Sequence, residues 1–143
     1  MDYRYLDDLA TADIAFEATG ESVEQVFVAA AEATMNVMVE ELQSIEARVE
    51  RIIEKEDAEL DMLLFDMLQE IVYYKDAEQL LLRVRELAIT ERKGAYLLQA
   101  RAVGERLDPL RHDLRADVKA VTLHRFSLQK VDGLWKALVI LDV

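Results

Sequence analysis

The stretch from Val118 to the C-terminus constrains the fold more than any other, because it predicts a long β-hairpin. Two strand-like runs, Val118–Val131 and Leu134–Leu141, are separated only by Asp132-Gly133. Asp-Gly is a preferred two-residue turn, since both residues tolerate the positive φ angles that a tight hairpin needs. The second run is largely apolar on both of its faces, which indicates a central strand covered on both sides.

The preceding sequence supplies further strands and two helices. Alternating or continuous apolar residues predict four more strands, at 14–18, 45–51, 80–90 and 96–102, although the Glu content of 45–51 also permits a helix. A capping box at Ser22 and Gln25 precedes a helix expected over 23–42. A second helix begins at Asp57 or Asp61 and closes at 73–76. We expect one α+β domain over residues 1–143, with a mixed or antiparallel sheet of about six strands and both helices on one face.

Acidic charge is concentrated in the first half of the chain. The net charge is −12, and residues 1–72 hold 19 Asp and Glu against four Lys and Arg, whereas residues 73–143 hold 10 against 13. A phosphate backbone would be repelled by the first half, so extensive direct nucleic-acid binding is not expected. A basic protein partner or a cation is the natural complement, and the alternative is that the acidity only maintains solubility.

The composition also predicts where the chain works. Cysteine is absent, which excludes disulfides and thiolate metal sites. The N-terminal MDYRYLDD has neither the basic start nor the apolar run of a secretory signal. The longest apolar run, Val26–Ala31, is far shorter than the ~20 residues of a membrane helix. We therefore expect a cytoplasmic protein that does not enter membranes.

Two carboxylates near the ends of predicted strands are candidates for a metal site. Asp13 comes just before the first predicted strand and Asp142 just after the last. If these strands are antiparallel neighbours, Asp13, Asp142 and the carboxylate of Val143 converge, and like charges at such range need a proton or a cation. Oxygen ligands suit Ca²⁺, Mg²⁺ or Mn²⁺. The alternative is that Asp13 caps a turn and Asp142 is solvated.

Other residues give weaker signals for chemistry. The three serines lack a Gly-flanked nucleophile elbow, and the sequence has neither a Gly-rich phosphate loop nor the paired His of a zinc site. Lys119 is expected on a strand, where a solvated side chain is the commonest outcome. His112 is expected to be exposed in the loop RLDPLRHDLRAD, and His124 to be a candidate core histidine.

Several motifs together resemble the archease family over most of the chain. TADIAFEATG followed by VEQVF is similar to the family's N-terminal strand and helix start. Gly104-Glu105, followed by His112 and then VKAVTLH, is similar to its central motif. GLWKALVILDV is similar to its C-terminal strand, which in the family also stops after an Asp and one apolar residue.

The resemblance implies a non-catalytic accessory protein for the tRNA-splicing RNA ligase of the RtcB type. Family members promote guanylylation of that ligase and its multiple turnover, and they carry a divalent cation, usually calcium. By motif match, the cation ligands would be Asp13, Asp142 and Val143, and the chain would stop there because its end is itself a ligand group. Lys119 matches a functionally important lysine, and His112 is carried over as a second candidate activation residue.

The N-terminal motif departs from the family pattern. Family members commonly have Asp-His-Thr-Ala-Asp, whereas this chain has LDDLATAD, without the histidine. Asp7 or Asp8 would then occupy its space.

Two other functions remain open from the sequence. Carboxylates with a hard cation could activate water in a stand-alone phosphoester hydrolase, although no general base or phosphate cradle accompanies them. Alternatively, the cation could only hold the C-terminus in a chaperone-like binding module.

Overall fold

Two antiparallel sheets enclose the helices of this protein. The computed structural model describes residues 1–6 and 13–143, and within these ranges it contains seven strands and two α-helices. In chain order the elements are β1 (Asp2–Leu6), β2 (Asp13–Gly20), α1 (Val23–Met38), the 3₁₀ turn η1 (Leu42–Ser44), β3 (Val49–Asp57), α2 (Leu60–Glu78), β4 (Leu80–Arg92), β5 (Ala95–Arg106), β6 (Ala120–Val131) and β7 (Leu134–Asp142).

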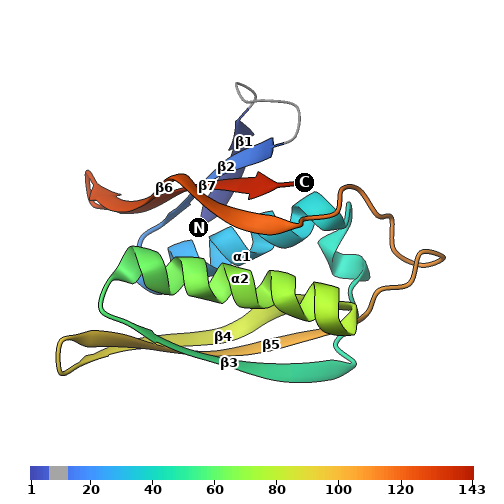
Figure 1. The fold of residues 1–143 in the computed structure, drawn as a ribbon, viewed down its shortest axis with the longest axis horizontal. Coiled ribbons are helices and arrows are strands. Elements are labelled where there is room, and N and C mark those ends of the chain that lie inside the picture. Colours follow the sequence, from blue (N-terminus) through green and yellow to red (C-terminus); the bar gives the residue numbers. More distant parts are fainter. Residues whose placement is uncertain (7–12) are drawn as a thin grey trace.

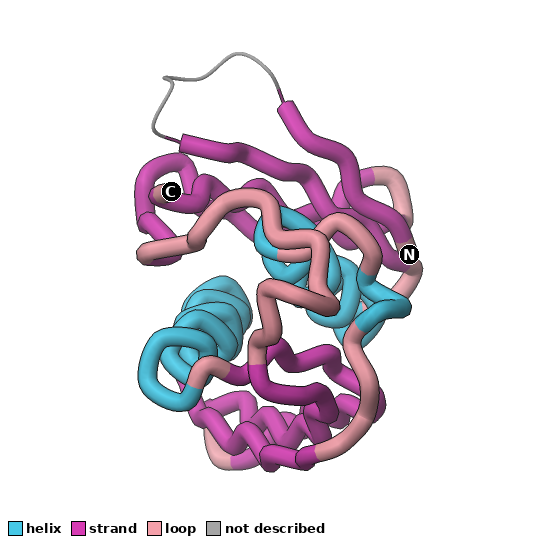
Figure 2. The backbone as a smooth tube through the Cα atoms, turned by 90° about the vertical axis from the view of Figure 1, so that its right-hand side faces the viewer, coloured by secondary structure: helices cyan, strands magenta, loops and turns pink. Residues whose placement is uncertain are grey.

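The expected α+β class is confirmed, with the strands divided between two sheets rather than gathered in one. The first sheet has the order β1-β2-β7-β6 and the second β3-β5-β4, and every pairing is antiparallel. Both helices lie between the sheets (Figures 1 and 2). Each helix therefore covers the inner face of one sheet and packs on the other as well.

The C-terminal hairpin forms as predicted. Asp132 and Gly133 both have positive φ angles, 53° and 81°, as the tight turn requires. The same geometry recurs at Lys93 and Gly94, which join β4 to β5. β7 lies between β2 and β6, so the expectation of a central final strand is confirmed. The helices cover only one of its faces (Figure 1), not both as predicted.

The core fills the space between the sheets. Phe16 of β2, Val139 of β7, Phe27 of α1 and the α2 residues Leu64 and Leu68 are all fully buried in one continuous core cluster. At ~25 cal/mol per Å² of apolar surface, burial of such side chains is the main stabilising contribution. No helix in the described part of the chain is long and apolar enough to cross a membrane.

The first helix begins where the capping box predicts. The Ser22 hydroxyl accepts a hydrogen bond from the Gln25 amide at 3.1 Å, and Gln25 Oε1 accepts from the Glu21 amide at 2.9 Å. The helix ends at Met38, however, not near 42. Val39 turns into an extended conformation and forms a β-bridge with Leu114, so a long-range contact ends the helix.

Two strand predictions need correction. β3 begins at Val49 rather than at 45, because residues 45–48 pack irregularly on the end of β5, and it continues to Asp57. Its alternating burial on the edge of the second sheet agrees with the predicted period of two. β1 was not predicted at all; Tyr3 and Tyr5 face the core, and the Tyr5 hydroxyl donates to the Ala33 carbonyl at 2.7 Å.

Candidate functional site

The structure brings Asp13 and Asp142 together at one end of the first sheet. β2 and β7 are antiparallel neighbours, and Asp13 is the register partner of Asp142. Residues directly opposed across antiparallel strands hold their Cβ atoms about 4.5–5.5 Å apart. Val143 follows Asp142 immediately. The geometric condition for the predicted cation site, convergence of these strand ends, is therefore met.

The two aspartates lie on the sheet face that points away from the helices. Their strand neighbours of opposite parity, such as Phe16 and Val139, are fully buried in the core. Because side chains alternate along a strand, Asp13 and Asp142 share the other face with Glu17. Both aspartates are half-buried, which is suitable for ligands that stay accessible to an ion from solvent.

The donor set at this end consists of oxygen atoms. None of the ion pairs among the described residues involves Asp13 or Asp142. Within residues 1–6 and 13–143, no group of three or more His, Cys, Asp and Glu side chains is placed to hold a metal. Two carboxylates supplemented by the oxygens of Val143 would fit a hard cation such as Ca²⁺, which readily takes carboxylate, carbonyl and water ligands.

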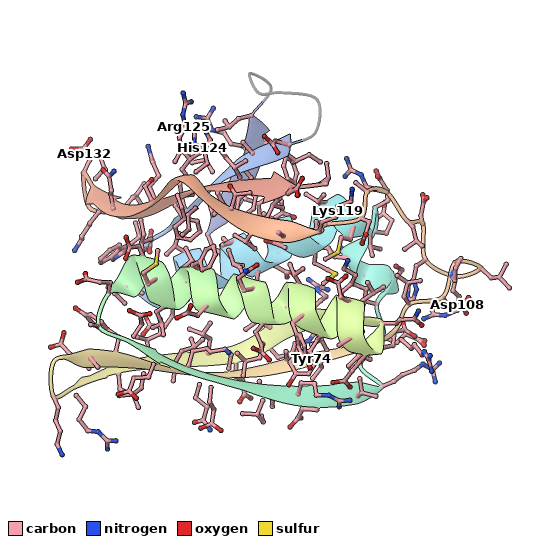
Figure 3. All side chains as sticks on the ribbon, in the orientation of Figure 1. Tyr74, Asp108, Lys119, His124, Arg125 and Asp132 are labelled. Carbon is pink, nitrogen blue, oxygen red and sulfur yellow. The ribbon has the colours of Figure 1, made fainter. Side chains whose placement is uncertain are left out.

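Lys119 lies beside this pair of aspartates. Its amide donates a hydrogen bond to the Asp142 carbonyl oxygen at 2.8 Å, and the next residue, Ala120, is the register partner of Asp142. Lys119 was expected on a strand, but it lies just before β6, which begins at Ala120, and its side chain is exposed (Figure 3). Its ammonium group is thus accessible to a partner or to a phosphate as a point charge.

His112 is not exposed, so that expectation is wrong. It is only 3% exposed, and both ring nitrogens have partners. Nδ1 accepts a hydrogen bond from the Asp108 amide at 2.9 Å, so the proton of the neutral ring is on Nε2, which lies 3.1 Å from Glu105 Oε2. A role for His112 in activation stays a prediction, and it would have to operate through the loop that His112 holds.

Glu105 is the centre of this second polar cluster, and the sequence indicated it only as part of the Gly104-Glu105 motif, with no role of its own. Its carboxylate accepts from the Glu46 amide at 2.6 Å and pairs with Arg111, and Arg48 Nε lies 3.5 Å from its other oxygen. Burial alone would raise the pKa of Glu105, but the Glu46 amide, Arg111 and His112 together lower it to about 2. The cluster is therefore charged and internally satisfied.

The residue before Glu105 is Gly104, and the close approach of β4 to β5 requires a glycine there. A Cβ atom at this position would lie 1.7 Å from the Leu81 carbonyl oxygen of β4. Only glycine permits β5 to approach β4 this closely. The Gly-Glu pair thus combines a close strand contact with a buried carboxylate.

His124 was a candidate core histidine, and that prediction is also wrong. The β6–β7 register shifts between Thr122 and Ser127, and Arg125 has a positive φ of 55°. His124 has the parity of Ala120 and Thr122, which pair with Asp142 and Ile140 on the face that points away from the helices. His124 is therefore exposed rather than in the core, as Figure 3 shows. Asp7 and Asp8, predicted to replace the missing motif histidine, lie outside the described residues.

The fold and site together define an α+β protein with helices enclosed by two sheets and an oxygen-rich strand end. The model of the Archease protein family (MTH1598/TM1083) matches residues 3–143. The chain therefore belongs to the archease family, and the resemblance seen in its motifs is confirmed.

Curated relatives and solved structures agree with this assignment. Protein archease of Pyrococcus furiosus is 36% identical over 134 residues, covering 93% of this chain and 94% of the relative. Protein archease of Methanosarcina mazei is 36% identical over 142 residues, which cover 99% of this chain and 95% of the relative. The solution structure of Methanobacterium thermoautotrophicum protein 1598 superimposes with a TM-score of 0.85 at 36% identity, covering 99% and 98%. The crystal structure of a Thermotoga maritima archease, described as a possible chaperone, has a TM-score of 0.57 at 20% identity, covers 94% and 93%, and supports the fold alone.

Proposed function

We propose that this protein activates a tRNA-splicing RNA ligase of the RtcB type in the cytosol. It does so as a non-catalytic partner that promotes guanylylation of the ligase and repeated turnover. A divalent cation, calcium by preference, is held by Asp13, Asp142 and Val143. Membership of the archease family supports the coarser assignment, and the ligase is what the resemblance implies.

The observation that carries the proposal is the direct opposition of Asp13 and Asp142 on an outward sheet face. Two adjacent carboxylates without a basic partner among the described residues repel each other, and a bound proton or cation relieves this repulsion. The oxygen donors at this strand end favour the cation. When bound, the cation supplies a fixed positive charge on an otherwise acidic surface. The chain's own residues hold this charge near Lys119, whose amide is joined to Asp142.

The uneven charge of the chain suggests how the ligase is recognised. The strongly acidic first half complements a basic, RNA-binding surface, and such complementarity mainly increases the rate of association. Lys119 then contacts a phosphate or an acidic ligase residue near the cation. Association is therefore expected to weaken as the salt concentration rises.

The proposal is tested by measuring guanylylation and turnover of the ligase with and without this protein. We expect stimulation by the unsubstituted protein and its loss in Asp13→Ala, Asp142→Ala and Lys119→Ala. Glu17→Gln is the matched control, because Glu17 is a carboxylate on the same face of β2 but is paired with Arg4 instead of facing Asp142. It should stimulate normally.

The other outcomes separate the remaining functions. Undiminished stimulation by all three variants would remove the proposed site. Hydrolysis of phosphoesters by the isolated protein, abolished in Asp13→Ala, would indicate a metal-dependent hydrolase instead. Calcium-dependent stability with no effect of any variant on the ligase would leave a cation-held binding module.

A further inference from the structure

Helix α2 holds the segment that leads into β6. Lys75 Nζ donates to the Val118 carbonyl oxygen at 2.8 Å and also bonds to the Asp117 carboxylate. Further along, Gln69 Oε1 accepts a hydrogen bond from the Val121 amide at 3.1 Å. The segment is thus attached to α2 at two points, one on each side of residues 119 and 120.

Lys75 is an unusual residue for this task, because lysine is rarely buried. It is only 7% exposed, although its ammonium group also pairs with Asp76. Burial opposes the charged form, but the hydrogen bonds to Asp117 and Asp76 hold the pKa of Lys75 above its ordinary value. The lysine therefore stays charged and fixed, and its stem is restrained by the surrounding core.

A short series of contacts joins Lys75 to the candidate cation site. Lys75 fixes Val118, and the amide of the following residue, Lys119, donates to the Asp142 carbonyl oxygen at 2.8 Å. Asp142 in turn faces Asp13 across the strand pair. The route from Lys75 to Asp142 therefore crosses two hydrogen bonds and the Val118–Lys119 peptide between them.

We propose that Lys75 is a positioning residue for the cation site. By anchoring Asp117 and Val118, it fixes the Lys119 amide against Asp142 and so sets the separation of Asp142 from Asp13. This inference rests on the proposed function, since it assigns Lys75 a role toward the cation held there. It also assigns α2 a part in the site that none of the sequence motifs indicated.

The sign of the effect distinguishes positioning from simple electrostatics. If Lys75 acted only as a nearby positive charge, its removal would strengthen the binding of a cation. If it positions Asp142, its removal loosens the site and weakens binding. Substitutions in residues that orient metal ligands typically reduce affinity roughly 10- to 100-fold.

The test compares Lys75→Met with a matched control, Lys55→Met. Lys55 pairs with Glu70 at 2.6 Å and so joins α2 to β3 on the other side of the helix, away from residues 117–121. Calcium affinity is measured by titration calorimetry, and hydrogen exchange of the Lys119 amide by NMR. For Lys75→Met we expect calcium to bind about tenfold more weakly and the amide to exchange faster, while Lys55→Met leaves both unchanged.

Unchanged or tighter calcium binding in Lys75→Met would overturn the inference and leave the proposed function intact. If the unsubstituted protein bound no calcium, the proposed cation site would fail, and the Lys119 exchange rate alone would decide whether Lys75 positions this segment. Should Lys75→Met not fold, Asp117→Asn replaces it, because Asp117 is exposed and its carboxylate is bound by Lys75. Unchanged affinity and exchange in Asp117→Asn would then contradict the inference.

Discussion

The molecule carries two groups of charged residues, one at the end of the first sheet and one at the end of the second, and they differ in how their charges are compensated. Around Glu105, the buried carboxylate has a backbone amide, two guanidinium groups and an imidazole as partners. At Asp13 and Asp142, two carboxylates face each other, and no described residue forms an ion pair with either. The first group is compensated within the protein, whereas the proposed function assigns a bound cation to the second.

Within a single set of family motifs, this difference separates residues that compensate each other's charge from residues that the proposed function assigns to a cation. Buried polar groups that satisfy each other stabilise one conformation of the chain, and breaking them costs stability. Side chains of like charge placed side by side destabilise the folded state by their repulsion until a ligand of opposite charge binds between them. Both groups lie in motif stretches, so membership of a motif does not by itself identify a ligand.

The largest loss of stability is expected on substitution of Gly104, the residue next to Glu105. Gly104→Ala would place a Cβ against the Leu81 carbonyl oxygen, which cannot move without breaking the β4–β5 ladder. We expect a loss of about 4 kcal/mol or more in the free energy of unfolding, measured by urea denaturation. Gly94→Ala is the control, because a Cβ atom at Gly94 would meet no neighbouring atom and only the positive φ angle of Gly94 disfavours alanine. It should lower the free energy of unfolding by about 1–2 kcal/mol. Equal losses would contradict the close-approach argument.

The second-largest loss of stability is expected when the negative charge of Glu105 is removed. Glu105→Gln removes the negative charge that compensates Arg48 and Arg111 and leaves one acceptor oxygen in place of two, so we expect a loss of about 2–3 kcal/mol in unfolding free energy. Glu50→Gln, which breaks the exposed pair with Arg101, should cost about 0.5 kcal/mol or less. Calcium affinity should be unchanged in both. If Glu105→Gln lowered calcium affinity as strongly as Asp13→Asn, the two groups would not be independent.

The same carboxylate predicts a dependence of stability on pH. Because the folded-state pKa of Glu105 is lowered from 4.5 to about 2, its contribution is fully present above the ordinary carboxyl pKa. This contribution is lost as the pH falls through the interval from 4.5 toward 2. Urea denaturation at a series of pH values should show a decline in this interval that is smaller in Glu105→Gln. An identical decline in both proteins would assign the acid sensitivity to other carboxylates.

The smallest effect is expected at the opposed aspartates in the absence of metal. Like charges directly opposite each other in a strand pair are destabilising, so Asp142→Asn in a chelator should gain about 0.5 kcal/mol in unfolding free energy. The sign matters more than the size, because most substitutions destabilise. A clear loss in chelator would mean that Asp142 has a stabilising partner, and the contrast with Glu105 would fail.

The sequence predicted the parts of this structure that depend on local signals. Asp132-Gly133 specifies its own turn, Ser22 and Gln25 specify a helix start, and the strand pattern around Asp13 and Asp142 placed both at strand ends. The division into two sheets could not be predicted, because periodicity shows which face of a strand is buried but not which strands are neighbours.

The burial of His112 could not be predicted either, because it also depends on long-range contacts. A loop residue beside Pro109 and several charged residues has every local mark of exposure, and its burial depends on Glu105 and on the irregular segment that precedes β3. The exposure of His124 was missed because strand parity does not show which face of β6 meets the helices, and the face that His124 shares with Ala120 and Thr122 points away from them. Long-range contacts, rather than residue types, decided both outcomes.

The most direct test of the contrast is thermal unfolding with chelator and with calcium, for the unsubstituted protein, Asp13→Asn and the control Glu17→Gln. A ligand that binds only the folded state raises the melting temperature. We predict that calcium raises the melting temperature of the unsubstituted protein and of Glu17→Gln, but leaves Asp13→Asn unchanged. No rise in the unsubstituted protein, or an equal rise in Asp13→Asn, would contradict a cation site at the opposed strand ends.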